Sequence, residues 1–84
     1  MFMQQGLLEL DIHGMNKHQA KVFIDSRLRR ADTSVYRVRI IHGYRGGTEL
    51  RDMVRLEYGK GHPKVLRVSP SLNPGETELV LREY

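Results

Sequence analysis

Two histidines follow apolar segments of the sequence, and the neighbours of each suit chemistry on a bound ligand. The first lies in Leu10-Asp11-Ile12-His13-Gly14, where Asp11 and His13 are two residues apart. In a strand this spacing points both side chains to one face of the sheet. A carboxylate beside an imidazole orients the ring and raises its basicity, which suits His13 as a general base or proton donor. The same two residues can bind a divalent metal, although two ligands do not define a metal site; the alternative is an exposed histidine on a polar face.

The second histidine opens the glycine-rich segment His42-Gly43-Tyr44-Arg45-Gly46-Gly47, between a predicted strand and a predicted helix. Glycines let the backbone approach a ligand closely, and the free N–H groups of a helix start attract anions. Arg45 can bind a phosphate with two parallel hydrogen bonds, and Tyr44 can either stack on a base or pack on the neighbouring helix. The alternative is a connector whose glycines are needed only for a tight turn. The sequence contains neither a Walker A loop nor a dinucleotide-binding fingerprint.

Arginine is concentrated in the middle of the chain. Residues 25–55 contain eight arginines and four carboxylates, a difference of +4 that equals the net charge of the whole chain. Arginine suits bidentate phosphate recognition, so a polyanionic partner is one interpretation. The other is a solvated helix face with ordinary charge pairs.

The hydrophobic pattern predicts six elements. Strands are expected over 7–13, 35–42, 64–69 and 76–82, the third with Leu66 and Val68 on its inner face. One helix is expected over 16–31, where Asn16 and Gln19 have the spacing of a capping box. A second is expected to begin after Gly47 or Thr48 and to stop at Gly59.

The order β-α-β-α-β-β predicts an α/β two-layer sandwich. Each strand is polar at alternate positions, so one face of the sheet is covered, and two right-handed crossovers in one direction place both helices on that face. We expect a four-stranded mixed sheet with its first three strands parallel and the fourth antiparallel, in one domain spanning 1–84 with a core over about 7–82. Both histidine motifs then lie at the carboxyl ends of parallel strands, where open α/β sheets bind ligands. The helix-free face is expected to show Glu9, Asp11, Arg37, Arg39, Arg67, Glu78 and Arg82.

These motifs resemble those of the Smr domain, the small MutS-related module, over about residues 8–81. Leu10-Asp11-Ile12-His13 matches the L-D-x-H motif of that family in full. Ile40-Ile41-His42-Gly43 matches the start of its second motif, H-G-x-G, and Leu50-Arg51 resembles the L-R that follows. Gly75-Glu76-Thr77 falls where the family tends to carry a further glycine-rich stretch. The chain departs from the pattern after Gly43, where two residues instead of one precede the next glycine.

The resemblance implies a stand-alone Smr domain with a fold similar to the C-terminal domain of the third bacterial translation initiation factor. It also implies binding of DNA or RNA and, as in several members, endonuclease nicking assisted by a metal such as Mg²⁺ or Mn²⁺. Carried over, Asp11, His13 and His42 are the candidate catalytic residues, and Asp11 and His13 the candidate metal ligands. The predicted nucleic-acid contacts are Arg37, Arg39, Gly43, Tyr44, Arg45, Gly46, Gly47 and Arg51.

Two alternatives to a nuclease remain at this point. One is a non-catalytic module that binds structured DNA or RNA, and the other is a protein-interaction domain whose arginines meet an acidic partner. The chain has no cysteine, no secretory signal pattern and no apolar run near the roughly 20 residues that span a bilayer. We therefore expect a cytoplasmic protein without a membrane partner. Among the oligomeric states, which the sequence leaves open, a monomer is favoured.

Overall fold

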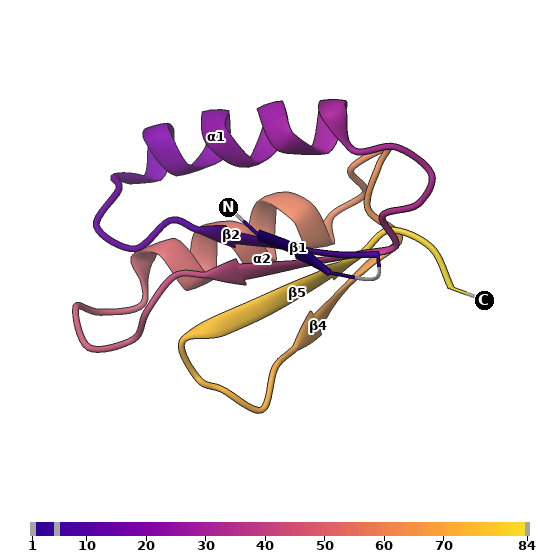
Figure 1. The fold of residues 1–84 in the computed structure, drawn as a ribbon. Helices are drawn as coiled ribbons and strands as arrows, with labels where there is room; N and C mark the ends of the chain where they lie inside the picture. The colour runs from indigo at the N-terminus through magenta and orange to yellow at the C-terminus, as the bar shows by residue number, and fades with distance from the viewer. Residues whose placement is uncertain (1, 5, 84) are drawn as a thin grey trace.

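The computed structural model describes residues 2–4 and 6–83 as one mixed sheet with two helices on one of its faces (Figure 1). The sheet order is β1-β2-β3-β5-β4. The elements, in chain order, are β1 (Phe2–Gln4), β2 (Leu7–Asp11), α1 (Lys17–Arg30), β3 (Arg37–Ile41), α2 (Glu49–Gly59), β4 (Arg67–Pro70) and β5 (Glu76–Val80). From β2 onward, the expected two-layer β-α-β-α-β-β arrangement is confirmed. No helix within these ranges is long and apolar enough to cross a membrane.

The strand directions agree with the prediction. β2 and β3 are parallel, and β5 is antiparallel to both β3 and β4, so β4 runs in the same direction as β2 and β3. β5 lies between β3 and β4, and its first residue, Glu76, pairs with Ile41 at the end of β3. The turn before β5 is therefore held beside the loop that follows β3.

The four expected strands are present, and the sheet has one strand more, β1. β1 pairs antiparallel with β2, with Phe2 opposite Glu9. A segment of three residues is too short to show an alternating pattern, so the sequence did not reveal it. The reversal between β1 and β2 contains Gly6 at φ +86°, where a side chain would overlap the ring of Tyr36.

The helices are amphipathic and cover one face of the sheet. The capping box of α1 is confirmed: Asn16 Oδ1 accepts from the Gln19 N–H at 2.8 Å, and Gln19 Oε1 accepts from the Asn16 N–H at 3.0 Å. The core between the layers consists of Leu8, Leu10, Ile12, Ala20, Ile24, Leu28, Val35, Val38, Ile40, Met53, Val54, Tyr58, Val65 and Leu79.

Two element boundaries and one side-chain orientation differ from the sequence-based expectation. β2 ends at Asp11, so His13 lies in the following turn. α2 continues through Gly59, and Gly61, at φ +109°, is the left-handed residue after the Lys60 cap. Leu66 is exposed rather than inward, because a turn in which the Val65 N–H donates to the His62 carbonyl directs Val65 into the core.

Candidate functional site

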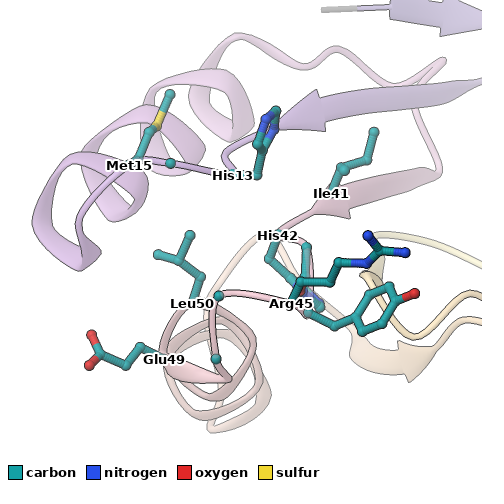
Figure 2. A pocket seen from close by; sticks show the side chains of 12 residues that line it. His13, Met15, Ile41, His42, Arg45, Glu49 and Leu50 are labelled. Carbon is teal, nitrogen blue, oxygen red and sulfur yellow. The ribbon is translucent and has the colours of Figure 1, made fainter.

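A cavity of about 610 Å³ lies at the carboxyl edge of β2 and β3, between the loops that lead into α1 and α2. Figure 2 shows His13 and Met15 on one side of it and His42, Arg45 and Leu50 on the other. The two histidine motifs therefore meet at one edge, as their positions after parallel strands predicted. The cavity is lined by His13, Gly14, Met15, Ile41, His42, Gly43, Tyr44, Arg45, Gly46, Gly47, Glu49 and Leu50.

Asp11 and His13 form a hydrogen-bonded pair at the rim. The His13 Nδ1 contacts Asp11 Oδ1, and the His13 backbone N–H donates to the same oxygen at 3.1 Å. Burial raises the pKa of Asp11, but the hydrogen bonds and the charge of His13 outweigh it, so the pKa lies below its usual value. Asp11 is therefore ionised at neutral pH and can only accept. In the neutral His13 ring the proton is then on Nδ1, and Nε2 carries a lone pair.

The Asp11–His13 pair is open to solvent, and only one of its two residues lines the cavity. The side chains of His13 and Asp11 are 68% and 49% exposed, so a substrate can reach both. His13 lines the cavity, whereas Asp11, at the end of β2, contacts His13 from outside it. Asp11 thus orients the ring, and His13 presents Nε2.

His42 is in the opposite situation, because its ring is buried and fully hydrogen-bonded. Its Nδ1–H donates to the Gly43 carbonyl at 2.8 Å, so its unprotonated Nε2 accepts from the Thr77 hydroxyl, also at 2.8 Å. Burial lowers the pKa of His42, the Gly43 carbonyl opposes this, and the charges of Arg55 and Arg51 lower it further. His42 therefore stays neutral at pH 7, and its ring joins β3 to β5.

The turn before β5 is a third component of the site. The Gly75 carbonyl accepts from the N–H groups of His42 and Gly43 at 2.9 and 3.0 Å. Gly43 has φ +75°, which favours glycine, and a Cβ there would lie 3.7 Å from His13 Cβ. Thr77 and the Gly75 carbonyl were not among the predicted site residues; in the sequence, Gly75-Glu76-Thr77 was noted only as a further glycine-rich stretch of the resemblance.

The tip of the β3–α2 loop is exposed. Tyr44 lies close to Gly75 of the hairpin, and the residue is 53% exposed. Arg45 makes no hydrogen bond or ion pair within residues 2–4 and 6–83. Together with Gly46 and Gly47 it forms a cationic rim with accessible backbone. Its guanidinium is available for a phosphate.

The other predicted arginine contacts lie away from the cavity. Arg37 pairs with Glu78, and Arg39 lies 3.3 to 3.6 Å from carboxylate oxygens of three glutamates on the helix-free face, Glu9, Glu76 and Glu78. Arg51 pairs with Asp52 at 3.1 Å. The carboxylates compensate the charge of this face, so the net excess of arginine does not translate into a basic sheet surface.

The donor set for a metal is limited. No cluster of three or more histidine, aspartate or glutamate side chains suited to a metal occurs in the part of the chain that the structure describes. Asp11 offers a carboxylate, which is a ligand that Mg²⁺ accepts when substrate phosphates and water supply the rest. A closed site made by the protein alone is thus not formed by these residues.

Comparison with known proteins agrees with this geometry. The crystal structure of the Smr domain of Thermus thermophilus MutS2 is similar with a TM-score of 0.79 and 23% sequence identity, covering 90% of this chain and 99% of that one. No curated protein matches the sequence. The sequence pattern of the Smr domain matches residues 10–75, which include both histidine motifs and extend to Gly75. The chain therefore belongs to the Smr domain family.

Proposed function

We propose that this domain binds nucleic acid at the carboxyl edge of its sheet and nicks a phosphodiester bond there, with the Asp11–His13 pair as its proton-transfer group. The Smr family consists of nucleic-acid-binding domains of the nicking-endonuclease type. The observation that carries the proposal is the exposed His13 ring, oriented by an ionised Asp11 and adjacent to a cationic, glycine-rich loop.

Binding is assigned to the β3–α2 loop. Arg45 has no competing carboxylate among the described residues, and a guanidinium binds a phosphate through two parallel hydrogen bonds. The exposed Gly46 and Gly47 allow a phosphate to approach the main chain. His42 holds this loop through Gly43 and Thr77, so its role in the proposal is to position the loop.

The chemical step follows from the state of His13. Its Nε2 accepts a proton from the attacking water while the water oxygen forms a bond to phosphorus. The bond to the leaving sugar oxygen breaks, and that oxygen keeps the electron pair and takes up a proton from solvent. Asp11 accepts from Nδ1–H throughout and stabilises the imidazolium that forms. Such a base contributes roughly 10² to 10⁴ in rate.

In this proposal, Asp11 is the side chain that would bind a divalent ion. Mg²⁺ or Mn²⁺ bound jointly by Asp11 and a substrate phosphate would neutralise phosphate charge. All other contributions come from the side chains named above.

A plasmid-nicking assay with Mg²⁺ or Mn²⁺, paired with a labelled RNA assay, tests the proposal. His13→Ala is expected to lower the rate by about 10² or more, and Asp11→Asn to lower it because the ring loses its orientation. His18→Ala is the matched control, since His18 is an exposed histidine in the first turn of α1 that makes no hydrogen bond or ion pair with Asp11. Unchanged nicking in both His13→Ala and Asp11→Asn would refute the assignment.

A second function is favoured by the state of His42. Because both of its ring nitrogens are engaged, only one of the two motif histidines is free to transfer protons. A module that binds structured nucleic acid without cutting it fits this arrangement equally well. Salt-dependent binding without metal-dependent cleavage would identify it, and binding to no nucleic acid at all would instead favour an acidic protein partner.

A further inference from the structure

Tyr44 is an exposed aromatic residue in a cavity otherwise lined largely by polar and glycine residues. The residue is 53% exposed, and its hydroxyl makes no hydrogen bond within the described ranges. Neither core packing nor a polar contact of the hydroxyl therefore explains a large aromatic ring at this position.

The Tyr44 ring approaches the backbone of the hairpin closely at its Cδ1 atom. A Cβ on Gly75 would lie 3.3 Å from Tyr44 Cδ1 and 3.4 Å from the Gly43 Cα, closer than side chains ordinarily approach. Gly75 is itself buried. A glycine at this position thus lets the ring approach the hairpin closely, while Tyr44 as a whole remains 53% exposed.

The support beneath the ring is held in place by hydrogen bonds. The Gly75 carbonyl accepts the N–H groups of His42 and Gly43, and the Gly75 N–H donates to Asn73 Oδ1 at 2.8 Å. The ring therefore loses little conformational freedom when a flat ligand stacks on it, because its support is already ordered.

Arg45 follows Tyr44 directly in the chain and lines the same cavity. A base on the ring and a phosphate at the guanidinium can thus belong to one nucleotide or to two neighbouring ones. In a complete duplex both faces of each internal base are covered by its neighbours, whereas an unpaired base exposes a face for stacking on an aromatic side chain.

We propose that Tyr44, supported by Gly75, is a stacking platform for one unpaired nucleobase, so that this edge selects nucleic acids with an unpaired nucleotide beside the bound phosphate. The inference rests on the proposed nucleic-acid binding and adds to it the class of substrate. Tyr44 acts here as a specificity residue, separate from proton transfer by His13.

The test uses oligonucleotides of one sequence that carry 2-aminopurine, as a single strand, as a complete duplex and as a duplex with the reporter base unpaired in a gap. Binding is measured by fluorescence anisotropy in EDTA, so that no cleavage occurs, and stacking by quenching of the reporter. The single strand and the gapped duplex are expected to bind roughly tenfold more tightly than the complete duplex, with quenching.

Substitutions at Tyr44 separate stacking from bulk. Tyr44→Ala and Tyr44→Leu are both expected to remove the tenfold preference and the quenching, and Tyr44→Trp to keep them, because only the aromatic face stacks on a base. Leu56→Ala is the control, since Leu56 is 65% exposed on α2 and does not line the cavity. Circular dichroism of each variant verifies the fold.

The outcomes distinguish this inference from the function on which it rests. Equal affinity for all three oligonucleotides, lost in Arg45→Ala, would overturn the platform and leave the phosphate site standing. Quenching that persists in Tyr44→Leu would also overturn it. No binding of any oligonucleotide would overturn both.

Discussion

His13 and His42 show how two histidines in similar local sequences acquire different properties. His13 follows the end of β2 in a turn and keeps one ring nitrogen free, whereas His42 is 5% exposed and bonded at both nitrogens. The difference comes from tertiary neighbours. Thr77, which occupies the second nitrogen of His42, is 35 residues away in the chain.

Arg45 is the residue with which phosphate binding is best measured. We expect Arg45→Ala to weaken binding to single strands and duplexes alike, and to reduce the slope of log affinity against log salt by about one. Arg29→Ala is the matched control, because Arg29 is exposed at the end of α1, at the opposite edge of the sheet. Equal slopes for Arg45→Ala and the unmodified protein would remove Arg45 from the phosphate site.

At the scale of single residues, the sequence predicted which residues lie at the site better than it predicted the side chains that they contact. Asp11 and His13 are two residues apart, and the prediction that their side chains lie side by side is confirmed, although His13 lies in the turn after β2 rather than in the strand. Arg37 and Arg39 were expected to contact nucleic acid. Sequence spacing did not reveal that β5 would place Glu78 between them as an ion-pair partner.

At the scale of elements, His42 joins the end of β3 to Thr77 in β5. Because His42 is titratable, the stability of this junction depends on pH. Its pKa is lowered in the folded protein, so between that value and the ordinary 6.5 the unfolded chain binds more protons. Lower pH therefore favours unfolding. The positive charges of Arg51 and Arg55 act in the same direction, and Glu76 opposes them.

We expect the free energy of unfolding in urea to fall between about pH 7.5 and about pH 5.5, and to fall less in His42→Gln. Comparing the two proteins isolates His42 from the other histidines. The carboxylates with lowered pKa, such as Asp11 and Asp25, lose their stabilising contribution only at more acidic pH. An identical fall in both proteins would show that His42 is not the group responsible.

The elements themselves were largely readable from the sequence. The helices follow from apolar spacing and from the Asn16–Gln19 box. β1 was missed because three residues carry no period, and Leu66 was placed inward because a regular alternation was continued through a turn. Strand order was not predictable, since antiparallel pairing of β5 with β3 depends on long-range contacts.

At the scale of the whole molecule, a polar contact joins the two helices. The Tyr58 hydroxyl donates to Asp25 Oδ1 at 2.6 Å, and Lys21 Nζ donates to Asp25 Oδ2 at 2.9 Å. Burial and the hydrogen bond to Asp25 raise the pKa of Tyr58 well above its usual value, so the hydroxyl remains a donor. Burial raises the pKa of Asp25, but hydrogen bonds from Tyr58 and Lys21 outweigh the effect of burial. The pKa of Asp25 is therefore below its usual value.

Tyr58→Phe is expected to destabilise the domain by about 1–2 kcal/mol, because a partly buried carboxylate loses one donor. Tyr44→Phe is the control, since that hydroxyl has no hydrogen bond within residues 2–4 and 6–83. Urea unfolding at neutral pH measures both. A loss as large in Tyr44→Phe would mean that the Asp25 contact does not account for the effect.

The shared Gly75 carbonyl also bears on motion. The His42 and Gly43 amides follow the last residue of β3, yet both donate to an oxygen of the β4–β5 turn. Their exchange with deuterium should therefore be slow and should speed up only when the β4–β5 hairpin opens, so the two segments fluctuate as one unit. Opening of the hairpin would then set how long the site keeps its shape between successive encounters with a ligand.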